Sequence, residues 1–107
     1  PWGRPATGMS DVQLRYTLKK ALKEANAFIA KRKHRDQMSE DALQRYMDYM
    51  QSLDSTQTDY EAKLDALKAA WDAAKERWNE ANKAVDDALQ RIVELREELA
   101  RRGVPEL

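Results

Sequence analysis

Hydrophobic residues recur through the second half of the chain in an unbroken alternation of four- and three-residue steps. This spacing returns to the same side of a helix every seven residues and is typical of a coiled-coil seam. The series comprises Tyr60, Leu64, Leu67, Trp71, Ala74, Trp78, Ala81, Val85, Ala88, Ile92, Leu95 and Leu99. The pattern predicts a long helix over about 58–102 that packs along its length against another helix.

The first half of the chain carries two further helical patterns, over about 10–35 and 39–54. Ser10 is a good N-cap for the first, and Gln13, three residues later, completes a capping box. The segment 31–35 has no large hydrophobic residue, but the chain contains neither Gly nor Pro from 31 to 39. We therefore expect the two helices to be either continuous or separated by a kink near 35–39.

Residues 54–59 form the clearest interior interruption, because each of their side chains competes with the backbone for hydrogen bonds and favours a turn. The alternation of hydrophobic positions nevertheless continues through this segment, so one uninterrupted helix also fits the pattern. We favour the turn. At the other end, Gly103 suits the left-handed position that follows a helix, and Pro105 prevents the helix from resuming.

The segments 10–54 and 58–102 have equal lengths, which favours folding the chain back on itself near residue 56. This fold pairs Leu14 with Leu99, Leu18 with Leu95, Ala21 with Ile92, Ala25 with Ala88, Phe28 with Val85, Leu43 with Trp71, Tyr46 with Leu67, and Leu53 with Tyr60. A parallel homodimer would instead place like charges together beside the seam. We therefore predict an all-α fold, a long antiparallel helical hairpin or coiled coil.

The chain divides into three parts by composition. Residues 1–8 contain two Pro and two Gly and are expected to be a flexible arm, either an expression remnant or an interdomain linker. Residues 9–103 are expected to form a single helical coiled-coil domain, and 104–107 a short tail.

Composition limits the classes of function that we expect for this chain. Charged residues make up 36% of the chain and the formal net charge is zero, so no global field attracts nucleic acid or anionic lipid. The chain has no Cys and one His, which gives no basis for a metal site, a cofactor or a small-molecule substrate. It contains no apolar run long enough to span a membrane and no signal-peptide pattern, so we expect a soluble protein and favour the cytoplasm.

Aromatic and methionine residues of the middle of the chain are the candidate partner-binding residues. They are Trp71, Trp78, Tyr46, Met47, Tyr49 and Met50. Such residues are enriched in binding hot spots and adaptable interfaces, although they also serve to fill a core. A second apolar stripe would stay partly exposed in a single hairpin, and pairing two hairpins into a four-helix assembly would cover it. This stripe comprises Leu22, Ile29, Met47, Tyr49, Leu89 and Val93.

The segment 31–35 is the most concentrated basic stretch, and it provides the nucleic-acid candidates Lys31, Arg32, Lys33 and Arg35. The alternative is a solvated helix surface, which we favour because acidic residues follow at once and no recognition motif accompanies the stretch. In the hairpin register, Arg35 approaches Trp78, which predicts a cation–π contact.

The acidic residues give no sign of catalysis. Glu94, Glu97 and Glu98 are expected on an exposed helix face, and no nucleophile lies at a useful spacing from a base. We therefore predict a non-enzymatic interaction or assembly module that acts as a homodimeric scaffold or adaptor and also binds another protein. The alternatives are a nucleic-acid-binding module, and a rod-like receptor-binding or structural hairpin cut from a larger secreted toxin or a viral or phage protein.

Overall fold

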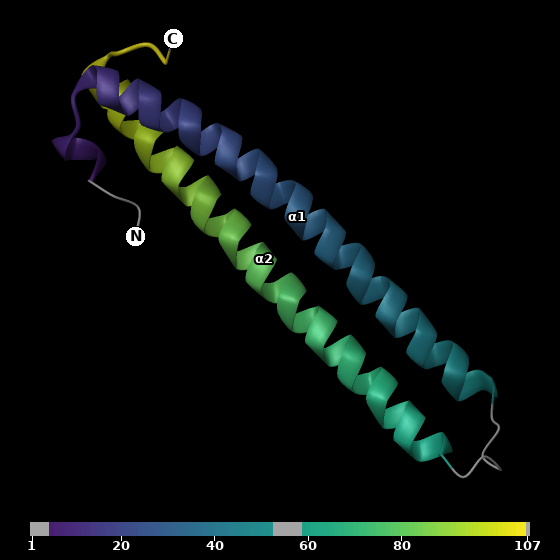
Figure 1. Cartoon of the computed structure of the whole chain (residues 1–107). Helices are drawn as coiled ribbons and strands as arrows, with labels where there is room; N and C mark the ends of the chain where they lie inside the picture. The colour runs from purple at the N-terminus through teal and green to yellow at the C-terminus, as the bar shows by residue number, and fades with distance from the viewer. Residues whose placement is uncertain (1–4, 53–58, 107) are drawn as a thin grey trace. The chain divides into compact units, whose positions relative to one another are not determined.

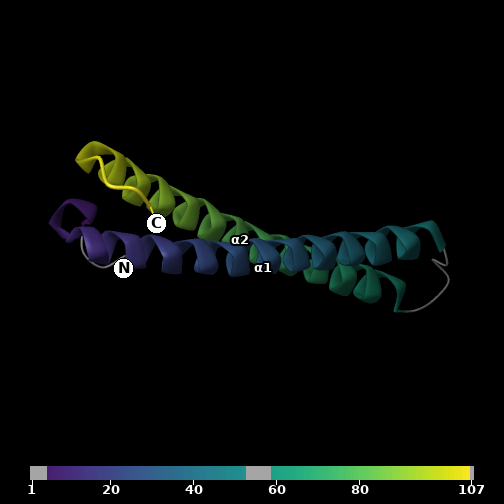
Figure 2. The ribbon, with the colours of Figure 1, turned by 90° about the horizontal axis from the view of Figure 1, so that it is seen from above.

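The computed structural model describes residues 5–52 and 59–106. A short 3-10 helix, η1 (Ala6–Gly8), precedes the long helices α1 (Asp11–Ser52) and α2 (Tyr60–Arg102). Figure 1 and Figure 2 show that α1 and α2 run in opposite directions. The described residues contain no strand. The predicted all-α antiparallel hairpin is confirmed.

Helix α1 is continuous, so the kink considered near 35–39 does not occur. The sequence supports this continuity because this stretch lacks Gly and Pro and consists mostly of good helix formers. The capping box at its start is also confirmed. The Ser10 amide donates to Gln13 Oε1 at 2.9 Å, and the Gln13 amide donates to Ser10 Oγ at 3.2 Å.

Helix α2 ends in a Schellman motif. Gly103 has φ 69°, a conformation that strains any residue with a Cβ. Its amide donates to the Ala100 carbonyl, and the Val104 amide donates to the Leu99 carbonyl, both at 3.0 Å. These two bonds satisfy carbonyls that the helix leaves without a partner.

The predicted turn lies outside the described residues, except for Asp59. Leu53 also lies outside them, and so does its predicted contact with Tyr60.

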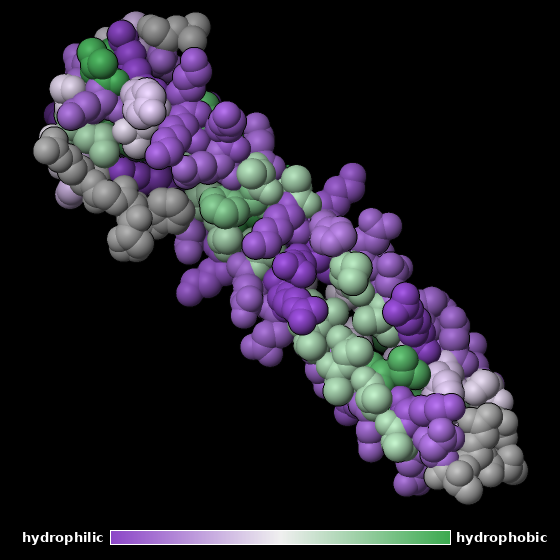
Figure 3. Space-filling view, in the orientation of Figure 1, coloured by the Kyte–Doolittle hydropathy of each residue, from purple (hydrophilic) through white to green (hydrophobic). Residues whose placement is uncertain are grey.

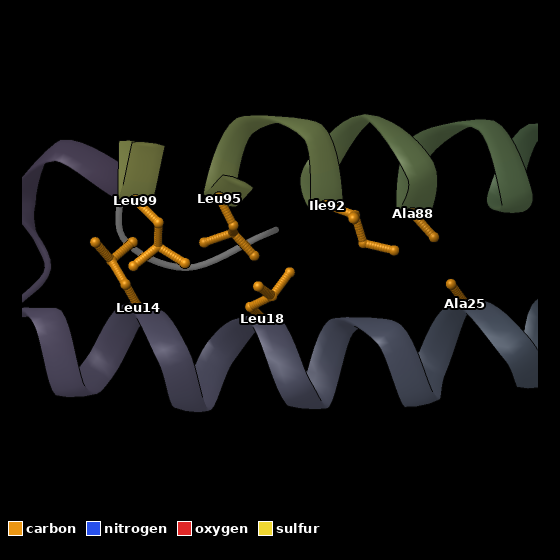
Figure 4. Packing of buried hydrophobic residues seen from close by; sticks show 7 residues of the cluster. All are labelled: Leu14, Leu18, Ala25, Ala88, Ile92, Leu95 and Leu99. Atoms are coloured by element: carbon orange, nitrogen blue, oxygen red, sulfur yellow. The ribbon is translucent and has the colours of Figure 1, made fainter. Parts of the chain in front are cut away.

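The two helices form two compact units, which we describe separately. Unit 1 comprises Pro1–Ala30 and Lys83–Leu107. Figure 4 shows Leu14 facing Leu99 and Ala25 facing Ala88 across its seam, in the predicted register. The buried cluster comprises Leu14, Leu18, Ala25, Ala88, Ile92, Leu95 and Leu99. Unit 1 therefore has a dry core that excludes water from several large side chains.

Unit 2 comprises Lys31–Asn82. Its buried hydrophobic residues are Ala74 and Ala81, and the larger side chains of its seam are only half-buried. Tyr46 contacts Trp71 with ring centroids 6.0 Å apart, one helical turn from the predicted Leu67. This diagonal offset keeps the predicted register, but the described part of unit 2 has no large side chain that is fully buried.

Described residues of both terminal segments pack against the core of unit 1. Residues 1–8 were expected to form no regular element, yet they include η1, and Ala6 packs against the core together with Met9. In the C-terminal tail, Val104 also packs against the core.

Candidate protein-interaction surfaces

The aromatic–methionine surface of unit 2 comprises the residues Tyr46, Met47, Tyr49, Met50, Trp71 and Trp78. Within it, Trp71 contacts Tyr46 in a tilted arrangement, with 36° between the ring planes. Lys75 Nζ lies 3.8 Å from the centroid of a Trp71 ring and also pairs with Asp72 at 3.2 Å. A half-exposed Lys side chain therefore occupies one face of Trp71, and a competing apolar group can displace it.

The heptad spacing explains why the two tryptophans are left half-buried. Trp71 and Trp78 are one heptad apart on the same side of α2, and the small residues Ala74 and Ala81 fill the neighbouring seam positions. The alanines are buried at 8% and 7% exposure, because small side chains let helices approach closely. An indole is too large to fit fully between two helices that approach so closely, so both tryptophans present part of their surface to solvent.

The α1 side of this surface is aromatic and adaptable. Tyr49 stacks on Tyr60 with centroids 5.3 Å apart, while its Oη is buried and has no hydrogen-bond partner among the described residues. Met47 is 39% exposed and Met50 is half-buried. Unbranched methionines repack easily around different partners. The six candidate residues therefore lie in one unit, neither buried as a core nor fully solvated.

The basic stretch 31–35 does not form a single exposed patch. Lys31 and Lys33 are exposed, whereas Arg32 and Arg35 are half-buried. Arg32 Nη1 donates to Asn82 Oδ1 at 3.1 Å and so links the two helices of unit 2. The predicted cation–π contact between Arg35 and Trp78 is wrong. Within the described part of the chain, Lys75 forms a cation–π contact with Trp71 instead.

Unit 1 exposes an apolar strip on one side, which we call the unit 1 flank and define as Leu22, Ile29, Leu89 and Val93. Leu22 is half-buried, and the other three are 39%, 44% and 45% exposed. Figure 3 shows how exposed hydrophobic side chains, in green, alternate with hydrophilic ones on the face it presents. The part of the predicted second stripe that lies in unit 1 is therefore accessible to a partner.

The expected exposure of Glu98 is wrong, since this residue is only 6% exposed. Its carboxylate accepts hydrogen bonds from Arg101 and, at 2.9 Å, from Arg102 Nε. The hydrogen bond from Arg101, together with that from Arg102, lowers the pKa of Glu98 to about 2 against the opposing effect of burial. A carboxylate held in this way is a poor proton acceptor, so it gives no support to acid–base catalysis.

Arg102 also joins the two ends of unit 1. Its guanidinium donates to the carbonyls of Met9 at 2.7 Å and Thr7 at 3.2 Å, and it pairs with Asp11 at 3.1 Å. Sequence reasoning missed this cluster. The spacing of Glu98 three and four residues before two arginines was a signal for it, but no local pattern shows that the chain's N-terminal segment lies within reach.

Other kinds of site find little support in residues 5–52 and 59–106. In this part of the chain, no three His, Asp or Glu residues gather as metal ligands do. None of the helices in these ranges combines the length and apolar character needed to cross a membrane. The chain matches no protein-family model, no curated protein and no solved structure. The proposals below therefore rest on its own residues.

Proposed function

We propose that this chain is a non-enzymatic coiled-coil module that acts through protein–protein contacts, as a homo-oligomeric scaffold or adaptor. The observation that carries this proposal is the half-exposed aromatic–methionine surface of unit 2. A helix pair that served only to fold would bury its largest apolar side chains, as unit 1 does with Leu14 and Leu95.

The composition of the aromatic–methionine surface favours binding of another apolar helix. Trp and Tyr contribute large contact areas with few rotatable bonds, and they are frequent among residues that dominate binding energy. The neighbouring methionines adapt to the shape of the partner. We propose that this surface contacts an amphipathic helix of another protein, laid along the seam of unit 2 in the helix-in-groove mode.

Self-association is the second part of the proposal. The unit 1 flank leaves three large apolar side chains at least 39% exposed, and a second hairpin would cover them. The formal net charge of zero places no large repulsion between copies. The nucleic-acid alternative has less support, because Arg32 is already hydrogen-bonded within unit 2.

The experiment that tests the function is sedimentation equilibrium of the full chain from micromolar to near-millimolar concentration. Acrylamide quenching of tryptophan fluorescence is measured on the same samples, with Trp2→Phe so that only Trp71 and Trp78 report. We expect a dimer whose tryptophans stay accessible to the quencher, because the aromatic–methionine surface is kept for another protein. A strict monomer at every concentration would contradict the assembly function, and loss of quenching on dimerisation would exclude the adaptor surface.

A further inference from the structure

Four side chains on one side of α2 within unit 1 form a strip that is complementary to itself. Asp86, Leu89, Val93 and Arg96 follow one another in steps of three, four and three residues, so they lie along one side of the helix. Reading the strip backwards exchanges the acidic and basic ends and exchanges the two apolar residues. All four positions are symmetric about residue 91.

On α1, the flank residue Leu22 lies at the height of this centre. The core pairs Leu18 with Leu95 and Ala25 with Ala88, which places Leu22 level with residue 91. Leu22 is therefore level with the midpoint of the α2 strip. A single axis through this level relates the α2 strip to itself, pairs Leu22 with Leu22 of a second copy and sets Ile29 opposite Arg15 of that copy.

Leu22 and the α2 strip lie on the same side of unit 1, because the C-terminal tail reaches this side of both helices. Arg15, seven residues before Leu22, donates to the Pro105 carbonyl at 2.9 Å. The next residue of the tail, Glu106, pairs with Arg96 at 2.9 Å. The tail thus marks one edge of the unit 1 flank, and the apolar side chains beyond it stay uncovered.

We propose that a second copy of this chain docks antiparallel on the unit 1 flank, related by a two-fold axis that passes by Leu22 perpendicular to the helices. This inference rests on the proposed self-association and names its interface. Leu22 meets Leu22 of the second copy, and Leu89 meets Val93 of the second copy twice. Asp86 of each copy reaches Arg96 of the other, so both ends of the apolar contact carry opposite charges.

The surroundings of the flank fit this arrangement. A hollow beside Leu22 is lined by Leu18, Lys19 and Glu106, and it offers space for the second Leu22 side chain. Arg96 is 49% exposed in its pair with Glu106, so its remaining donors stay accessible to a second carboxylate. In isologous pairing, every contact away from the axis occurs twice, so the Leu89–Val93 and Asp86–Arg96 contacts are both doubled.

The charge pattern also explains why the occupant is a second copy rather than an unrelated helix. An unrelated apolar helix needs no acid and base placed at equal distances from the centre of the strip. The corresponding side of α2 in unit 2 carries Asp65, Lys68, Asp72 and Lys75 and has no apolar centre. The self-complementary strip is thus particular to unit 1.

Disulfide trapping tests the axis directly, because the chain contains no cysteine. In the full chain, Leu22→Cys is expected to form a disulfide-linked dimer under mild oxidation. Val12→Cys, an exposed position of α1, is the control. Its two copies would be about 30 Å apart along the helices, so it is expected to remain unlinked. Circular dichroism checks that both variants keep the helical fold. If the wild-type chain is a dimer and the Leu22→Cys variant fails to cross-link, the proposed axis is overturned.

A charge exchange tests the interface independently. Asp86→Arg and Arg96→Asp are each expected to weaken dimerisation at least about tenfold in Kd, because each creates two like-charge contacts. The double variant restores the opposite charges and is expected to recover most of the affinity. A monomeric wild-type chain would refute the proposed self-association itself. A wild-type dimer with no loss in the single variants, or no recovery in the double variant, would refute only this interface.

Discussion

Unit 1 and unit 2 are built from the same two helices with the same heptad spacing, but they use it differently. In unit 1 the seam positions hold leucines and other aliphatic residues that fit together, and Leu14, Val85 and Leu95 are 0% exposed. In unit 2 the corresponding positions hold indole and phenol rings between alanines, and the rings remain half-buried. Equal spacing therefore predicts that two helices pair, whereas the shape of the side chains decides whether the pair forms a dry core.

This difference has a consequence for stability and for binding. Aliphatic side chains that fill unit 1 stabilise the hairpin by removing apolar area from water. The half-covered rings of unit 2 contribute less to folding and leave apolar area for a partner to cover. We expect unit 1 to provide most of the stability and unit 2 to provide the binding surface.

The largest expected effect compares a leucine from each seam. Leu95→Ala in unit 1 is expected to lower the free energy of unfolding by about 3 kcal/mol, because it creates a cavity in a core without water. Leu67→Ala in unit 2 is expected to cost about 1 kcal/mol, since its half-buried side chain loses less area. Urea denaturation followed by circular dichroism measures both. Equal losses would remove the distinction between the units.

A smaller effect is expected for Trp71, despite the size of its side chain. Trp71→Ala removes the ring contact with Tyr46 and the contact with Lys75, and we expect a loss of about 1.5 kcal/mol. Trp2→Ala, which also removes one indole ring, is the matched control. The free energy of unfolding comes from the same urea titration. A loss as large as that of Leu95→Ala would mean that Trp71 is a core residue and would weaken the proposed binding role.

The smallest expected effect concerns the pH dependence of unit 1. The pKa of Glu98 in the folded chain is about 2, below its ordinary value of 4.5. The stabilisation by this carboxylate is therefore complete above about pH 4.5 and is lost as the pH falls towards 2. Glu98→Gln is expected to flatten the pH dependence of the urea midpoint in this interval. Glu97→Gln, one residue away, is the control.

An unchanged pH dependence in Glu98→Gln would show that the two arginines do not stabilise this carboxylate in solution. Hydrogen exchange provides a second measurement, because Arg102 holds the carbonyls of Met9 and Thr7. Acidification that protonates Glu98 leaves these bonds in place. We therefore expect the Gly8 and Met9 amides, which donate to the carbonyls of Pro5 and Ala6, to stay protected at low pH in the wild-type chain.

The sequence was sufficient to predict helices, register and helix ends, because these depend on spacing and on local backbone chemistry. Ser10 and Gln13 form the capping box that their separation implies, and Gly103 adopts the left-handed conformation. Burial was harder to predict. Glu98 carries a charge and was expected on the surface, yet two arginines in the next helical turn make its burial favourable.

The alternation of hydrophobic positions is enough to specify that the chain folds into paired helices, since it defines which side of each helix is covered. How well that side is covered emerges only in three dimensions, because coverage depends on the fit of large and small side chains across the seam. The tertiary structure also places the N-terminal segment beside the C-terminal end of α2. Arg102 bonds to residues more than 90 positions away, and contacts over such separations leave no periodic signal in the sequence.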